Sequence, residues 1–188
     1  MKKVFLLLAA FLVFFSARAQ VFNTGQTLKS GVFSLGVEPA LHINGGADDF
    51  ILFAHAGYGI KTGIDAGLKV GLGDPNYFGA DVEFALGSRV SLAVGAHNFS
   101  NFGLDGTLNI VFPIKSDLRL YGGLDSDLNF VETTNNEGDK ETELRTLLWV
   151  PIGLEVGLSS TMSLLFETEI GVTDDAYHII GGGLNFYF

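Results

Sequence analysis

The final stretch of the chain, Tyr177 to Phe188, alternates between two faces up to its last residue. Successive side chains of a strand point to opposite sides of the sheet. One face therefore carries His178, Ile180, Gly182, Leu184, Phe186 and Phe188. An open edge strand with apolar side chains invites aggregation, whereas a barrel needs such a strand to close onto its first one. The stretch therefore favours a closed barrel.

Ten segments in all show this alternation, each of roughly 10 to 14 residues, close to the length at which a tilted strand crosses a bilayer. They are Gly31–Ile43, Phe50–Lys61, Gly63–Gly73, Tyr77–Leu86, Arg89–Asn98, Phe102–Phe112, Asp117–Phe130, Leu144–Leu158, Thr161–Val172 and Tyr177–Phe188. We predict an all-β fold, a single antiparallel up-and-down transmembrane β-barrel of about ten strands, with eight as the alternative if two weak segments merge. Pro39 interrupts the first segment and predicts a bulge there.

Two features favour a membrane barrel over a soluble ligand-binding barrel whose faces would be reversed. The polar face is rich in Gly rather than in the Lys, Glu and Thr that suit a solvated sheet. Aromatic residues of the apolar face gather at the strand ends, as membrane interfaces select. One ring would be Phe50, Phe78, Phe102 and Phe130, and the other Phe33, Tyr58, Phe84, Phe112, Phe186 and Phe188.

The closing strand also carries a family resemblance. Phe188, with Phe186 and Leu184 at alternate positions before it, resembles the C-terminal signal of bacterial outer-membrane β-barrels, and the whole pattern is similar to the small porin-like and OmpA-like barrels. The resemblance implies residence in the outer membrane, contact with its lipid, and recognition of these three residues by the barrel-assembly machinery. It implies no activity, because one fold hosts many functions.

The first residues, Met1 to Ala19, have the pattern of a secretory signal peptide, with two lysines, a short apolar run and an Ala-x-Ala ending. The mature chain, from Gln20, would begin with a short periplasmic lead-in and continue as the barrel to Phe188. The absence of Cys excludes a lipidated cysteine and disulfides. A formal charge of −10 argues against nucleic acid as a partner, and we expect a monomer.

The connections predict the orientation. Short turns follow every second strand, and the one long connection is Glu132–Glu143. Outer-membrane barrels have short periplasmic turns and longer outer loops, so both termini are expected on the periplasmic side.

Charged residues fall on the inward parity, with carboxylates well in excess of cations. The predicted lumen charges are Glu38, Asp65, Lys69, Asp81, Glu83, Asp105, Arg119, Asp125, Asp127, Arg145, Glu155, Glu167 and Glu169. Because a barrel of this size is narrow, these side chains should largely fill it. A plugged barrel with a structural or surface-interaction role is therefore predicted, and a narrow cation-preferring channel is the first alternative.

A hydrolase at the outer rim is the second alternative. His42, His97 and His178 fall near the outer strand ends, with Asp105, Asp125, Asp127 and Glu169 as candidate partners. A His oriented by a carboxylate is the base half of a hydrolytic site. No nucleophile motif accompanies them, and the acidic connection lacks the spacing of a calcium loop. We therefore assign no catalytic, cofactor-binding or metal-binding residue.

Overall fold

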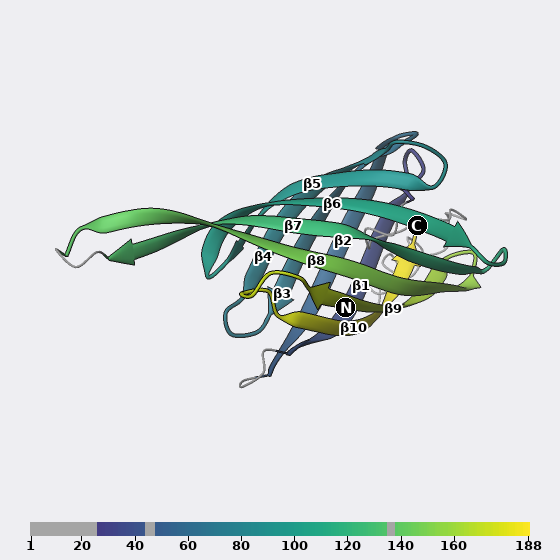
Figure 1. The fold of residues 1–188 in the computed structure, drawn as a ribbon. Helices are drawn as coiled ribbons and strands as arrows, with labels where there is room; N and C mark the ends of the chain where they lie inside the picture. The colour runs from purple at the N-terminus through teal and green to yellow at the C-terminus, as the bar shows by residue number, and fades with distance from the viewer. Residues whose placement is uncertain (1–25, 44–47, 135–137) are drawn as a thin grey trace, which may run out of the picture.

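The computed structural model describes residues 26–43, 48–134 and 138–188, which form one closed antiparallel barrel (Figure 1). The strands are β1 (Phe33–Ile43), β2 (Asp49–Lys61), β3 (Ile64–Leu72), β4 (Tyr77–Ala85), β5 (Val90–Phe99), β6 (Asn101–Pro113), β7 (Leu118–Thr134), β8 (Lys140–Ser159), β9 (Met162–Gly171) and β10 (His178–Tyr187). Among the described residues, no helix is long and apolar enough to cross a membrane. The predicted signal peptide, Met1 to Ala19, lies outside the described residues.

Each strand pairs with its neighbours in the sequence, and β10 pairs with β1 to close the ring. The closing ladder runs from Ser34 opposite Tyr187 to Ile43 opposite His178. Beyond it, the backbones of Phe33 and Phe188 exchange two hydrogen bonds of 3.1 and 2.8 Å. The predicted fold and the count of ten strands are confirmed, and eight strands are excluded.

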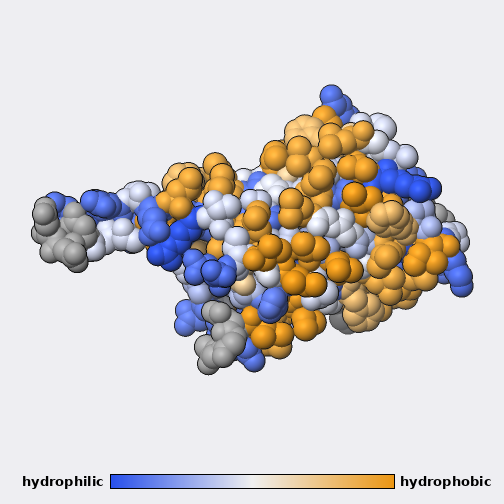
Figure 2. Space-filling view, in the orientation of Figure 1, coloured by the Kyte–Doolittle hydropathy of each residue, from blue (hydrophilic) through white to orange (hydrophobic). Residues whose placement is uncertain are grey.

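The outer face of the barrel is apolar. Large hydrophobic side chains from all ten strands stay exposed there, while their neighbours of the other parity are buried in the lumen. Hydrophobic residues cover much of the central body in the space-filling view (Figure 2). Phe102 and Phe130, from the predicted aromatic ring at one rim, stack 5.8 Å apart. A soluble barrel would bury this face, so the arrangement excludes that alternative.

The β7–β8 hairpin extends beyond the other strands and projects from one end of the barrel (Figure 1). The predicted long connection, Glu132–Glu143, is therefore mostly ladder, with Glu132 opposite Thr142 and Thr134 opposite Lys140. Its alternating Thr and charged residues suit a two-stranded ribbon in water on both faces. The prediction of a loop was wrong because polarity on both faces hid the strand period.

The predicted bulge at Pro39 is also wrong. The register of β1 against β2 runs unbroken through Glu38 and Pro39, and the register against β10 is the same before and after them. Bulges occur instead at Gly59/Lys61 and Gly157/Ser159, beside the turns. Glu38 and Pro39 have no paired residue on β10. Because proline has no backbone N–H to donate, it fits at this position without a shift in register.

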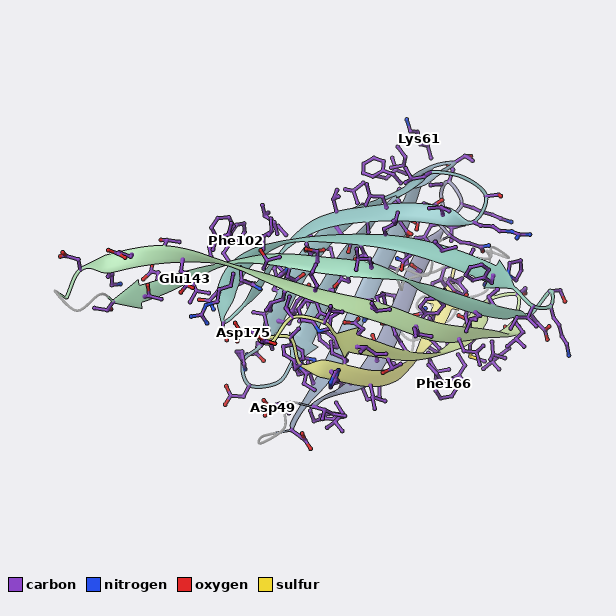
Figure 3. All side chains as sticks on the ribbon, in the orientation of Figure 1. Asp49, Lys61, Phe102, Glu143, Phe166 and Asp175 are labelled. Carbon is purple, nitrogen blue, oxygen red and sulfur yellow. The ribbon has the colours of Figure 1, made fainter. Side chains whose placement is uncertain are left out.

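We call the two ends of the barrel the turn end and the loop end. The turn end holds the short connections 62–63, 86–89, 114–117 and 160–161, together with Phe188. The loop end holds the connections 44–48, 73–76, 135–139 and 172–177. In Figure 3, Lys61 marks the turn end, whereas Asp49, Asp175 and Glu143 lie toward the loop end, and Phe102 and Phe166 point away from the barrel wall.

Candidate functional site: a divided lumen

The chain before β1 folds back into the turn end of the barrel. Leu28 and Val32 are buried there, and the backbone N–H of Leu28 donates a hydrogen bond to the Asp65 carboxylate. A Cβ atom at Gly59 would lie 1.9 Å from the carbonyl oxygen of Lys29, so only glycine permits this close approach. The residues just before β1 therefore act as a plug, which their lack of period in the sequence did not predict.

A partly buried ion pair lies next to this plug. Arg119 on β7 donates to Glu155 on β8 over 2.8 Å, and Glu155 is only 1% exposed. Arg119 also donates to the side chain of Gln26, which joins the pair to the plug. The Tyr187 hydroxyl lies 2.7 Å from Ser163 and donates to Glu155 over 3.4 Å. Charged groups with several partners of this kind hold their neighbours in one geometry.

A packed layer separates this half from the rest of the lumen. Val111, Tyr121 and Leu165 are each at most 1% exposed and form the hydrophobic cluster of the barrel interior. Tyr121 faces Gly153 across the β7–β8 ladder, and a Cβ there would lie 2.0 Å from its ring. The glycine thus makes room for the Tyr121 ring.

The loop-end half of the lumen contains a cavity of about 130 Å³. Its charged lining consists of seven carboxylates and one lysine, namely Glu38, Asp81, Asp105, Asp125, Asp127, Glu167, Glu169 and Lys69. These side chains come from six strands that the closed ring brings together. The excess of negative charge that parity predicted is therefore concentrated in one half of the barrel.

Aromatic rings form the rest of the cavity wall at its loop end. His42 stacks on Tyr177 at 4.5 Å, and Tyr77 packs against Phe53 at 5.5 Å and against Phe99 at 6.1 Å. Burial and nearby carboxylates raise the pKa of the Tyr177 hydroxyl, so this ring stays neutral and can donate a hydrogen bond. The wall combines ring faces with negative charge.

Lys69 on β3 shows what this wall can hold. Its Nζ atom lies over the Phe53 ring, 5.6 Å from the centroid. The charges of Glu38, Asp81 and Glu169 act on the same ammonium group. One cation therefore already sits between an aromatic face and carboxylates.

The three histidines considered for hydrolysis have different surroundings. His97 Nδ1 lies 3.3 Å from Asp105, and its Nε2 lies 3.6 Å from Asp127 and 3.3 Å from Asn129. Acceptors thus occupy both ring nitrogens, and none of these partners is a nucleophile.

The other two histidines stand apart from this cluster. His42 is buried at the cavity, whereas His178 is exposed on the outer face, where its Nδ1 accepts from the backbone of Gly171. Asp125 accepts from Thr107. Within the described part of the chain, no group of three His, Asp or Glu side chains is placed to hold a metal ion.

The other predicted lumen charges lie outside the cavity. Asp65 and Glu83 are buried opposite one another on β3 and β4, toward the turn end. Arg119 and Glu155 form the ion pair beside the plug. Arg145 lies on the projecting hairpin, 45% exposed, and its guanidinium contacts Glu143 at 3.3 Å, because β8 has risen above the rim at that point.

The inward aromatic residues Phe53, Tyr77 and Phe99 of this wall were not among the residues predicted from the sequence. The alternation does place two of them on the inward face, because Phe53 is two residues before the inward His55 and Phe99 is two residues after the inward His97. These aromatic residues interrupt the otherwise polar inward positions of their strands. Such a break in alternation is the signal that could have found the wall.

No protein-family model matches the sequence, and no curated protein matches it. Solved structures match the fold at low identity. The NanC porin is 11% identical over 81% of this chain and 98% of that one, with a TM-score of 0.53. The N-terminal β-barrel domain of Pseudomonas aeruginosa OprF (13% identity, 85% and 98% coverage, TM-score 0.42) and the attachment invasion locus protein Ail of Yersinia pestis (15%, 85% and 99%, 0.42) also match.

The closed ten-stranded ring and its exposed apolar face define the class of protein. The chain has the fold of a transmembrane β-barrel, with an apolar outer face of the kind that suits contact with lipid.

Proposed function

We propose that this protein is a closed outer-membrane barrel that acts at the cell surface through its loop end. The divided lumen carries the proposal, because the plug, the Arg119–Glu155 pair and the Tyr121 layer obstruct the path through the barrel. A cavity of about 480 Å³ remains at the turn end beside Gln26, Arg119 and Glu155, and the Tyr121 layer separates it from the loop-end cavity. A barrel blocked in this way does not serve as a general pore. What it offers to a partner is its loop end.

The projecting hairpin supports a role in surface interaction. The segment from Glu132 to Glu143 carries five acidic residues and a single lysine. Its described charges are exposed, and the pair between Lys140 and Glu132 is open to water on both sides. A long acidic ribbon favours a basic partner or cation-bridged contact over an acidic one.

Epitope insertion tests the orientation. A tag inserted after Asp139 is expected to be detected on intact cells, and the same tag after Ser160, at the turn end, only after permeabilisation. The reverse pattern would place the hairpin in the periplasm and contradict a surface role.

Export and assembly complete the proposal. The chain would lose Met1 to Ala19 on export, which the N-terminal mass of the purified protein tests. Phe188, whose ring lies 6.4 Å from that of Phe33 at the closure, would also serve with Phe186 and Leu184 as the signal for the assembly machinery. Its deletion should lower the yield of folded barrel in cells more than refolding into detergent, and equal losses would limit its role to packing.

A narrow cation-preferring channel is the second candidate. The seven carboxylates against one lysine in the loop-end cavity favour it, because such a lining repels anions. Planar-bilayer recording of the refolded full chain separates the two. We expect little or no steady conductance, with any rare openings selective for cations. Large, stable steps would favour the channel, and anion selectivity would contradict both.

A further inference from the structure

The loop-end cavity is lined by more carboxyl groups than its own lysine and the neighbouring His97 can pair. Lys69 is the single lysine or arginine among the described residues that line it. Water reaches the carboxylates, since the side chains of Asp105 and Asp127 are 18% and 19% exposed. The lipid-facing wall around them is a low-dielectric boundary, which focuses their field into the cavity. The resident charges thus attract a mobile cation.

Two buried polar groups at the same cavity lack partners. Asn109 is 0% exposed, and neither its Oδ1 nor its Nδ2 has a hydrogen-bond partner. The Nε2 atom of His42, which is more than nine-tenths buried, is also unpartnered. Buried polar atoms without a partner destabilise a fold. Asn Oδ1 and the unprotonated nitrogen of a neutral His are acceptors, so the N–H groups of a bound ligand would satisfy both.

The aromatic wall indicates which kind of cation fits. Aromatic faces attract ammonium groups, and Lys69 over Phe53 is an instance of that contact within this cavity. An engineered apolar cavity of about 150 Å³ binds one benzene molecule. The volume of about 130 Å³ here therefore suits an ammonium group on a short apolar body.

We propose that the loop-end cavity is a binding site for a small primary organic ammonium ion. The carboxylates neutralise its charge, Asn109 and His42 accept its N–H groups, and the aromatic wall covers its carbon atoms. This site rests on the proposed function in one respect only, because the proposed orientation sets the side of the membrane from which the cation enters. Binding in detergent tests it without that assumption.

The experiment is an NMR titration of the refolded full chain in an uncharged glucoside detergent. The probes are propylammonium, its neutral analogue propan-1-ol, and Mg²⁺. The reporters are the side-chain amide of Asn109 and the indole N–H of Trp149, which donates to the carbonyl of Tyr177 at 2.7 Å beside the cavity. We expect saturable shifts of both reporters with propylammonium and none with propan-1-ol.

Matched variants assign the contributions of charge. Asp127→Asn and Glu169→Gln should each weaken propylammonium binding about tenfold, since each removes a charge that faces the ligand in a confined site. Glu132→Gln removes the same charge from the exposed hairpin and should leave binding unchanged. Lys69→Met removes the competing resident cation and should tighten binding.

A second pair of variants tests the contribution of the aromatic wall to binding. Tyr177→Leu should weaken binding by several fold, whereas Tyr58→Leu, on the exposed outer face, should not. Absence of propylammonium binding in both the wild type and Lys69→Met would overturn the proposal, as would equal binding of propan-1-ol. Binding of Mg²⁺ alone would replace the organic cation with a metal ion. An open channel that still binds propylammonium would contradict the proposed function and leave this site intact.

Discussion

The two halves of the lumen are built from the same ten strands but are satisfied in different ways. At the turn end, Arg119 neutralises Glu155, the lead-in supplies a donor to Asp65, and Tyr187 bonds to Ser163. At the loop end, one lysine faces seven carboxylates. Both halves contain a buried asparagine without a hydrogen-bond partner, Asn109 in one and Asn185 in the other, so the two halves differ in their balance of charge. The turn end pairs its charges within the fold, whereas the loop end keeps an excess of carboxylates that the proposed ligand would balance.

The largest expected effect comes from breaking the ion pair of the turn end. Arg119→Met leaves the Glu155 charge buried without its partner, and we expect a loss of about 3–5 kcal/mol in the free energy of unfolding. Urea titration of the barrel refolded in lipid measures it. As a control, Lys140→Met breaks the exposed pair with Glu132 and should cost under about 1 kcal/mol. Equal losses in the two variants would show that burial at the turn end adds nothing.

The next largest loss of stability is expected in the packed layer that separates the two halves. Gly153→Ala would place a methyl group 2.0 Å from the Tyr121 ring, and forcing that ring aside should cost about 1–3 kcal/mol. The same urea titration applies. Gly106→Ala is the matched control, because the nearest atom to its Cβ would be 4.0 Å away. A stable Gly153→Ala barrel would mean that the layer between the halves is loosely packed.

The plug itself gives a smaller effect. Gly59→Ala should displace the carbonyl of Lys29 and with it the hydrogen bond from Leu28 to Asp65, at a cost of about 1 kcal/mol. Hydrogen exchange of the Leu28 amide should become faster. Gly87→Ala, where a Cβ meets nothing within 4 Å, should leave that exchange unchanged. Unaltered protection in Gly59→Ala would show that the lead-in does not depend on this contact.

The smallest expected effect lies in the loop-end half. Asn109→Leu replaces two unpartnered polar atoms by an apolar group of similar size, so we expect no loss of unfolding free energy, or a gain of up to about 1 kcal/mol. The same substitution should remove an acceptor from the proposed ammonium site. Urea titration and the propylammonium titration measure the two quantities on one sample. A clear loss of stability would show that Asn109 makes stabilising contacts in the folded barrel.

Much of this architecture could be predicted from the alternation alone. The period of two determined which side chains face lipid and which face the lumen, because each strand of a closed barrel has only these two faces. The clean run of β3, with Leu68 and Val70 outward and Lys69 between them, was assigned correctly. The even strand number and the closure at β10 followed from the same pattern and from the apolar C-terminal strand.

Parity could not tell how far along the barrel axis each inward residue lies, or which inward residues meet. Asp65 and Lys69 share one face of β3, yet one bonds to the plug and the other lies in the cavity. Arg145 has inward parity but sits above the rim, because the length of the β7–β8 ribbon depends on pairing in water rather than on an apolar period.

By itself, therefore, the sequence determined the class of fold, the lipid-facing surface and the sign of the lumen charge. Only the tertiary structure decided that this lumen is divided into a closed half and an acidic half. The physical reason is that both the plug and the cavity depend on the stagger between strands and on a lead-in without periodicity. Neither leaves a local pattern in the chain.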